Sequence, residues 1–328
     1  MARRRSDTEP SSTTGETLSR RQKRAEKRKA GQASGALYPR WYWPSFAGPA
    51  VLWLLVFFVV PFYVIFGIAF GTRDPIDQSA IPIWEPWWWT AKSARSVFSD
   101  IKAFQGPVFV RTFVYVLIAS MLCILIGYMV AYYVARFGGK WRGLYLGMLI
   151  APFFISYLMR MLAWINLLQP AGYVTRFLNW LPFVPHNVTW IGSNPMTLVL
   201  GLVYGYVPYM ILPLYGFLDS IGGSLLEAGR DLGASPTRTF LRVTLPLSRP
   251  AILAGVVIVS LPMFGDYYTH DLLAPGTRTS MVGNILDETI GQTGHQPQAA
   301  VYVLLLVGIL LIPMWYYLVS TKRSMEGR

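Results

Sequence analysis

The sequence predicts an all-α polytopic membrane protein with six transmembrane helices. Hydrophobic residues make up 53% of its 328 residues and charged residues only 14%, which is outside the range of ordinary soluble domains. Six apolar runs reach the length that a helix needs to cross a bilayer, roughly 20 residues. The runs lack the alternation of a transmembrane β-barrel, so we expect closed helices to satisfy the backbone polar groups in lipid.

The six runs define one transmembrane domain over residues 43–323. The predicted spans cover residues 47–70, 112–134, 144–168, 196–218, 251–273 and 299–320. Each run is too long and too apolar for a strand or a surface helix. In the fifth run, Pro262 and Gly265 should kink the helix or loosen a turn, and so free backbone polar groups.

A basic arm precedes the first span. Eleven of the 29 lysines and arginines lie before Trp41, in a stretch whose only large apolar residues before Leu37 are Met1 and Leu18, so we expect residues 1–42 to be disordered and cytoplasmic. The formal net charge of +13 could suggest a nucleic-acid partner. Its concentration in one arm beside a membrane fits an orientation signal or a contact with anionic lipid better.

The remaining basic residues are distributed unevenly between the two sides of the predicted membrane. Three lie in the loop after the second span, four in the loop after the fourth span and three in the C-terminal tail. The opposite side holds seven, and Arg160 lies within a span. The positive-inside rule therefore predicts that both termini and the loop at residues 221–248 are cytoplasmic.

Several functional classes lack the residues that they require. The single cysteine, Cys123, lies in an apolar run and is expected to be a small core residue. His186, His270 and His295 lack the spacing of metal ligands. The Asn187-Val188-Thr189 pattern matches a glycosylation acceptor, but this pattern is common by chance. The sequence contains neither G-x-S-x-G nor H-E-x-x-H, which argues against an intramembrane enzyme.

The cytoplasmic loop is predicted to form two short helices joined by a tight turn. Residues 225–232 can form the first helix, and Gly233 can end it in the left-handed conformation. Ser235-Pro236 then supplies an N-cap and a first-turn proline for a second helix, which Leu245-Pro246 is expected to end. A short rigid helix across the membrane face suits the transmission of force from a second protein. The alternative is an ordinary amphipathic connector.

The same loop carries a motif with defined spacing. Residues 227–233 read Glu-Ala-Gly-Arg-Asp-Leu-Gly, and Val-Thr-Leu-Pro follows nine residues later at 243–246. This spacing resembles the coupling loop of bacterial ABC importer permeases, written E-A-A-x3-G-x9-I-x-L-P, with Gly229 and Val243 as mild departures. The resemblance implies contact with an ATPase through Glu227, Ala228, Gly229, Asp231, Gly233, Leu245 and Pro246.

Other segments resemble one branch of that class, the spermidine/putrescine permeases. The similar stretches are residues 151–160 leading to Ala163-Trp164, residues 227–235, residues 261–273 and residues 281–285. The resemblance covers residues 47–320 and implies the six-helix type I ABC importer permease fold, with a coupling helix. It also implies polyamine import into a bacterial cell through the inner membrane.

The resemblance implies a set of partners. The pathway would consist of this chain and a second related permease, usually a different chain, with two ATPase subunits and an extracytoplasmic binding protein. Because the sequence has no G-x-x-x-x-G-K-S/T motif, we expect ATP and Mg²⁺ to bind the ATPase subunits and no cofactor to bind this chain.

Two alternatives stay open. Permeases for iron, thiamine, phosphonates or sugars share the coupling loop, so the loop does not separate them from a polyamine permease. A secondary transporter would need no ATPase, but would typically have more spans and inverted repeats.

Three ionisable residues in or beside the spans are candidates for the substrate pathway. Each costs roughly 2.5–3.5 kcal/mol at the centre of a bilayer, so such residues usually face a cavity or a partner. Asp266 is flanked by aromatic residues, and a linear polycation needs both carboxylates and aromatic faces. The alternative is that Asp266 pairs with Arg160 and is structural. The three ionisable candidates are Arg160, Asp266 and Asp271, the last at the outer mouth, and the aromatic candidates beside them are Trp164, Tyr267 and Tyr268.

The first external loop, residues 71–110, contains four tryptophans. They are Trp84 and the consecutive Trp87, Trp88 and Trp89. An interfacial segment lying on the lipid headgroups is one interpretation, because tryptophan favours that depth. A docking surface for an external partner is the other.

Overall fold

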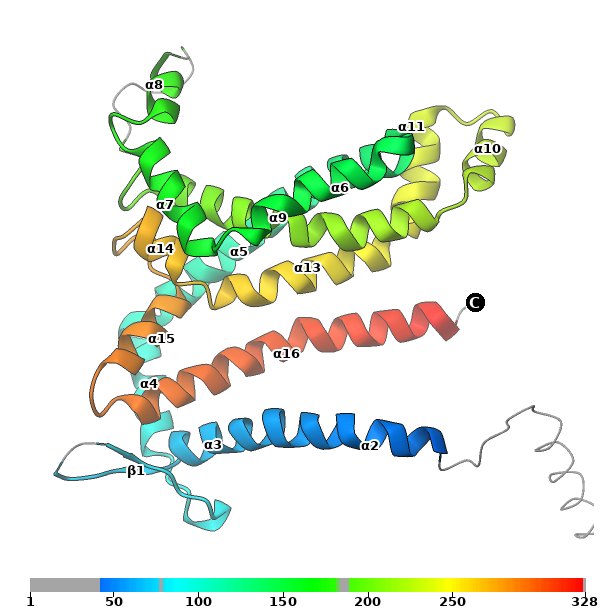
Figure 1. The fold of residues 1–328 in the computed structure, drawn as a ribbon. Helices are drawn as coiled ribbons and strands as arrows, with labels where there is room; N and C mark the ends of the chain where they lie inside the picture. The colour runs from blue at the N-terminus through cyan, green and yellow to red at the C-terminus, as the bar shows by residue number, and fades with distance from the viewer. Residues whose placement is uncertain (1–41, 77–78, 181, 183–188, 327–328) are drawn as a thin grey trace, which may run out of the picture. The chain divides into compact units, whose positions relative to one another are not determined.

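The computed structural model describes residues 42–76, 79–180, 182 and 189–326, and most of them are helical (Figure 1). The chain divides into two units, Met1–Pro61 and Phe62–Arg328, each of which is considered by itself. Apart from Tyr42, the predicted basic arm lies outside the described residues. So do His186 and the first two residues of the Asn187-Val188-Thr189 pattern.

The described part of the first unit is helical. It comprises α2 (Tyr42–Leu54), the π-helical turn η1 (Leu55–Val59) and the first two residues of α3 (Val60–Ala69). Residues Ser45–Ala69 form a helix that is long and apolar enough to cross a membrane. This agrees with the first predicted span at residues 47–70.

Three long helices form the core of the second unit (Figure 1). They are α5 (Gly106–Phe137), α9 (Pro195–Ser220) and α13 (Arg249–Phe264). Cys123 is buried among them, as expected. Small residues let the backbones approach, as helix pairs in lipid require. A Cβ atom on Gly127 of α5, for example, would lie 2.9 Å from the Cγ atom of Met210.

The second predicted span is part of a longer helix. α4 (Lys92–Asp100), the π-helical turn η3 (Ile101–Gln105) and α5 follow one another without a break, so that Lys92–Phe137 is one helix of 46 residues. The predicted span at residues 112–134 lies inside it. The N-terminal part of this helix occupies the second half of the segment that the sequence predicts as an external loop.

The third predicted span is broken in the structure, and the expectation of one continuous helix over residues 144–168 is wrong. α6 (Arg142–Ile150) and the 3-10 turn η5 (Ala151–Phe154) are followed by α7 (Tyr157–Leu168) at an angle of 90°. Ile155 and Ser156 between them have ψ angles of 136° and 140°. Such extended backbone cannot continue a helix.

The fifth predicted span ends early, at the place where Pro262 and Gly265 predict a loosened turn. α13 stops at Phe264, and α14 (Tyr268–Leu273) starts after an irregular segment. Upstream, α11 (Pro236–Thr239), the π-helical turn η6 (Phe240–Thr244) and α12 (Leu245–Leu247) lead into α13 with a bend of 60°. The second loop helix thus ends at Leu247, one residue after the Leu245-Pro246 pair at which the sequence predicts its end. Pro246 lies in the first turn of α12, where its missing N–H is tolerated.

The remaining elements connect and extend these helices. They are β1 (Thr72–Arg73), β2 (Ala80–Ile81), the 3-10 turns η2 (Pro86–Trp88) and η4 (Gly139–Trp141), α8 (Tyr173–Trp180), α10 (Gly223–Asp231), α15 (Val282–Gly291) and α16 (Gln296–Glu326). β1 and β2 pair antiparallel, with Thr72 opposite Ile81.

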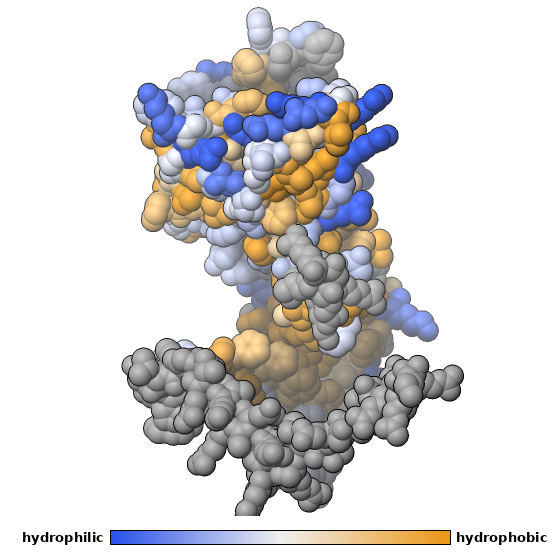
Figure 2. Space-filling model, turned by 90° about the vertical axis from the view of Figure 1, so that its right-hand side faces the viewer, coloured by the Kyte–Doolittle hydropathy of each residue, from blue (hydrophilic) through white to orange (hydrophobic). Residues whose placement is uncertain are grey.

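Four described helices are long and apolar enough to cross a membrane, and the count is six if each of the two bent pairs is one span. The six predicted spans correspond to these four helices and two pairs. Figure 2 views the end of the second unit that carries α10 and α11, and hydrophilic side chains gather there on an otherwise mixed surface. The predicted cytoplasmic loop thus lies at a polar end of the bundle.

Candidate functional site

The turn between α10 and α11, which we call the elbow (residues 232–235), is built by local chemistry. Gly233 has φ of +79°, a conformation that a side chain would strain. Its N–H donates to the carbonyl oxygen of Arg230 at 2.8 Å, and the N–H of Ala234 donates to that of Gly229 at 3.1 Å. This pair of bonds is the Schellman motif that ends a helix at glycine.

The second loop helix begins as the sequence predicts. The Ser235 hydroxyl accepts a hydrogen bond from the Arg238 N–H at 3.4 Å, and Pro236 occupies the first turn. α10 then lies against α11 through Gly229. A Cβ atom on Gly229 would be 3.5 Å from the Cγ2 atom of Thr239, which is an ordinary contact. The alanine of the family motif would therefore fit at this position.

The predicted coupling residues divide into two groups by exposure. Glu227, Ala228, Asp231 and Gly233 are exposed on α10 and the elbow, beside Leu232, whose side chain is 89% exposed. Gly229 is half-buried against α11, and Leu245 and Pro246 are half-buried, with Leu245 packed on the main core. The second group holds the loop in place, and only the first presents a surface.

Aromatic and polar contacts fix the loop to the long helices. The ring of Phe240 packs edge-on against Tyr128 and Tyr132 of α5, with centroids 5.6 and 5.4 Å away. The Tyr128 hydroxyl is 3.0 Å from the Oγ atom of Ser248, the residue at the 60° bend before α13. These contacts join the segment after α11 to α5 and to the start of α13.

A second site is a cavity of about 350 Å³ where α7, α9 and the break after α13 meet. We call it the tyrosine cavity. Five tyrosines line it together with two ionisable residues, one small residue of α9, and Pro262 and Gly265 beside the break. The lining residues are Tyr157, Arg160, Gly205, Tyr206, Tyr209, Pro262, Gly265, Asp266, Tyr267 and Tyr268.

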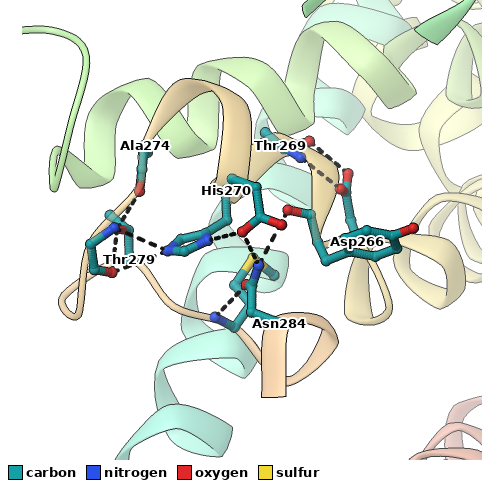
Figure 3. A network of polar contacts seen from close by, with 10 residues as sticks. Asp266, Thr269, His270, Ala274, Thr279 and Asn284 are labelled. Carbon is teal, nitrogen blue, oxygen red and sulfur yellow. Dashed lines mark hydrogen bonds and ion pairs between the residues drawn. The ribbon is translucent and has the colours of Figure 1, made fainter. Parts of the chain in front are cut away.

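Asp266 is only 7% exposed and accepts four hydrogen bonds. Thr269 supplies two, from its N–H at 3.0 Å and its hydroxyl at 2.7 Å (Figure 3). Tyr157 of α7 and Tyr206 of α9 supply the others, at 3.1 and 3.2 Å. All four donors are uncharged, so they hold the carboxylate in place without neutralising it.

Arg160 is 8% exposed and does not pair with Asp266, because no ion pair joins them among the residues described. Its guanidinium carbon lies 4.5 Å from the ring centroid of Phe153, 5.3 Å from Tyr157 and 5.9 Å from Tyr204. Its Nε and Nη1 atoms are buried without a hydrogen-bond partner in this part of the chain. The alternative that the two charges form a structural pair is therefore contradicted.

The structure brings four of the six predicted pathway residues to the cavity and leaves two outside its lining. Arg160, Asp266, Tyr267 and Tyr268 line it, and the two tyrosine rings stack with centroids 4.2 Å apart. Trp164 instead packs edge-on against Tyr204 at 5.3 Å. The Oδ1 atom of Asp271 is 2.8 Å from both the Nδ1 atom of His270 and the Nδ2 atom of Asn284.

Sequence reasoning missed the residues that hold Asp266. Tyr157 lies in a segment that the sequence predicts as a straight helix, and its hydroxyl reaches Asp266 because the chain bends by 90° just before it. Tyr206 and Tyr209 are three residues apart on α9 and so share one helical face, a signal that was present in the sequence. Gly205 permits the contact, because a Cβ atom there would lie 2.9 Å from the Cε2 atom of Tyr157.

Comparison with known sequences identifies relatives that match about four fifths of the chain. The family model described as "Binding-protein-dependent transport system inner membrane component" matches residues 123–325. The spermidine/putrescine transport system permease protein PotB of Escherichia coli (strain K12) is 31% identical over 272 residues, which are 80% of this chain and 93% of the relative. PotB of Haemophilus influenzae is 32% identical over 266 residues, with 81% and 89% covered.

Comparison with solved structures shows the fold. A chain of a bacterial alginate ABC transporter, in complex with an alginate pentasaccharide-bound periplasmic protein, superposes with a TM-score of 0.65 at 16% identity. The match covers 84% of this chain and 92% of that one. A second structure, of a bacterial ABC transporter that imports alginate, superposes with a TM-score of 0.63 at 18% identity and covers 92% and 99%.

Proposed function

The chain belongs to the family of binding-protein-dependent transport system inner membrane components, the permeases of ABC importers, and we propose that its substrates are polyamines such as spermidine and putrescine. The relatives with this activity in their names are aligned over most of their length. Their identity of 31–32% supports the substrate class and leaves the preferred polyamine to experiment.

The Asp266 carboxylate carries the proposal that the substrate is a cation. It is buried in the tyrosine cavity, and among the described residues no lysine, arginine or histidine nitrogen lies within 4.0 Å of it. An ammonium group that entered the cavity would find this uncompensated negative charge. The tyrosine faces around it would add cation–π attraction, worth roughly 0.5–2 kcal/mol per contact.

Arg160 opposes this attraction, and we propose that it keeps the affinity low. It lines the same cavity, and its guanidinium already lies over aromatic rings that could hold an ammonium group. A transport pathway must bind its substrate firmly enough to admit it and weakly enough to release it. A fixed cation opposite a fixed carboxylate provides that balance for a polycation.

The energy for transport is proposed to enter at the elbow. The exposed residues of α10 and the elbow, with Glu227 and Asp231 one helical turn apart, would contact an ATPase subunit that binds ATP and Mg²⁺. This proposal places the elbow and both termini in the cytoplasm. A second permease would complete the pathway, and an external binding protein would deliver the polyamine.

The test is uptake of radiolabelled spermidine and putrescine in a bacterial strain that lacks its own polyamine importers. The chain is expressed with its second permease, ATPase and binding protein. We expect saturable uptake that excess unlabelled polyamine abolishes and that iron, thiamine, phosphonates and sugars leave unchanged. Uptake of one of those solutes in place of polyamines would reject the substrate class and keep the family.

A further inference from the structure

A polar pocket lies where two predicted spans end on the external side. It has a volume of about 400 Å³ and is lined from three directions. Gly71, Thr72 and Arg73 follow directly after the predicted first span, Gln298 directly precedes the predicted sixth, and Lys92 begins α4. α4 packs against α16, and in Figure 1 it lies beside the start of that helix. Because it is built at the ends of two spans, the pocket lies at the depth of the lipid headgroups.

The charge of this pocket is positive. Arg73 and Lys92 both line it, and neither forms an ion pair within the part of the chain that the structure describes. Thr72, Thr90 and Ser96 add hydroxyl groups to the wall. Two cations among hydroxyl groups and the amide of Gln298, whose Oε1 atom is buried without a partner among the described residues, form a site that attracts anions.

The start of α4 adds donors to the same wall. The helix has nine residues, and its N-cap, Ala91, provides no side-chain hydrogen bond, so the N–H groups of the first turn lack a capping partner. Ser93 in that turn is 8% exposed, and its hydroxyl makes no hydrogen bond to any described residue. A helix N-terminus with its unsatisfied N–H groups favours negative charge.

Two exposed tryptophans directly precede the pocket segment in the sequence. Trp89 is held inside, because its ring stacks on Phe70 with centroids 5.1 Å apart and its Nε1–H donates to the carbonyl oxygen of Ile83 at 2.9 Å. This anchoring presents Trp87 and Trp88, which are 82% and 69% exposed, just before the pocket residue Thr90. Exposed tryptophan at the end of a span is typical of the membrane–water interface.

We propose that this pocket binds the phosphate of an anionic phospholipid in the external leaflet, with Trp87 and Trp88 inserted among the neighbouring headgroups. The basic side chains and the start of α4 would bind the phosphate oxygens. A polyamine cannot occupy the pocket, because its charge has the wrong sign. The depth of the pocket and the two exposed tryptophans favour a lipid over an acidic side chain of the binding protein.

The test is native mass spectrometry of the purified permease complex in detergent, titrated with dioleoyl phosphatidylglycerol. We expect the double variant R73Q/K92Q to bind this lipid about 30-fold more weakly, as the loss of two basic residues near an anionic headgroup predicts. The matched control is R95Q/K102Q, which removes two exposed basic residues of the same helix outside the pocket and should stay within about twofold of the wild type. Equal loss in both double variants, or in neither, would overturn the proposal.

Further variants separate the possible sources of the anion. Ser96→Asp places a carboxylate in the pocket without removing a cation, and should also weaken lipid binding. The double variant W87A/W88A should weaken binding of phosphatidylglycerol and leave competition by inorganic phosphate unchanged. If R73Q/K92Q binds lipid normally and instead loses stimulation by the binding protein, the pocket recognises a protein carboxylate and the lipid proposal is wrong.

Discussion

The elbow and the tyrosine cavity are built in opposite ways. The hydrogen bonds that shape the elbow among the described residues join positions fewer than six apart, such as those from Gly233 to Arg230 and from Arg238 to Ser235. The cavity instead joins residues of α7, α9 and the break after α13, with Tyr157 and Asp266 separated by 109 positions. A local structure tolerates change elsewhere in the protein, whereas a long-range one depends on how three helices pack. Substitutions should therefore act at the elbow through one backbone conformation, and at the cavity through several partners at once.

The largest effect is expected from Gly233→Pro. Proline requires φ near −65° where the chain has +79°, and it removes the N–H that bonds to Arg230, so the elbow would lose its shape at a cost of about 3 kcal/mol or more. We expect ATP-driven uptake to be abolished, while the chain still reaches the membrane. Uptake in cells measures the loss of transport, and the amount of ATPase that copurifies with the permease measures the loss of coupling.

The control for that variant is Gly233→Asn, because asparagine tolerates the left-handed conformation better than other residues with a side chain. It should keep most of the transport. If both variants transport normally, the conformation of the elbow has no part in coupling.

Asp266→Asn should have the next largest effect. The amide keeps the shape but removes the negative charge, and it cannot accept all four hydrogen bonds. We expect polyamine uptake to fall at least about tenfold, and the stability of the chain to fall by about 1–3 kcal/mol. Initial uptake rates at several polyamine concentrations, together with thermal unfolding in detergent, measure the two effects separately.

Asp271→Asn serves as the comparison for that prediction. Asp271 does not line the cavity, and its side chain is partly exposed while it contacts His270 and Asn284. The Asp271→Asn substitution should therefore lower polyamine uptake much less than Asp266→Asn. Normal uptake by a well-expressed Asp266→Asn variant would remove Asp266 from the pathway.

Glu227→Ala tests the exposed surface of the elbow without changing its backbone. Glu227 makes no hydrogen bond or ion pair among the described residues, so its loss should leave the permease as stable as before. If its carboxylate meets an ATPase, binding of that subunit should weaken about tenfold, which a titration of ATPase against permease in nanodiscs would show. An unchanged affinity would contradict the contact assigned to Glu227.

Arg160→Met should act in the opposite direction to Asp266→Asn. The guanidinium is buried without an ion pair, and an apolar side chain of similar volume at such a site is often neutral or stabilising. Removing the opposing cation should lower the apparent KM for spermidine by about fivefold, which corresponds to about 1 kcal/mol. A KM that rises would show that Arg160 helps to bind the substrate.

The smallest effect is expected from Gly229→Ala, which restores the alanine of the family motif. The new methyl group meets Thr239 at an ordinary distance, and alanine in a helix stabilises the chain by about 0.5–1 kcal/mol relative to glycine. Transport should stay at the wild-type rate. A clear loss of transport would mean that α10 and α11 must move against each other.

The difference between local and long-range contacts also determines which features of the structure the sequence predicts. Gly233, Ser235 and Pro236 predicted the elbow because each has a strong local preference that the surrounding fold does not override. The six apolar runs predicted the spans because lipid requires a minimum helix length. Both inferences depend only on residues that are close together in the sequence.

The breaks in the helices and the tyrosine cavity could not be predicted from residues that are close together in the sequence. Hydropathy does not distinguish a straight span from a pair bent by 90°, so the turn at Ile155 and Ser156 was missed and Tyr157 with it. The pairing of Asp266 with Arg160 was a reasonable alternative by charge. It fails because two tyrosines and Thr269 bond to the carboxylate while aromatic rings cover the guanidinium.

Reconstitution in proteoliposomes is the most direct test of a permease that is powered from outside its own chain. The vesicles contain this chain and its second permease, with or without the ATPase subunits, and labelled spermidine is presented by the binding protein. Accumulation should require ATP and the ATPase, and Gly233→Pro should prevent it. Accumulation at the full rate in vesicles that lack the ATPase would contradict the role assigned to the elbow and to the chain as a whole.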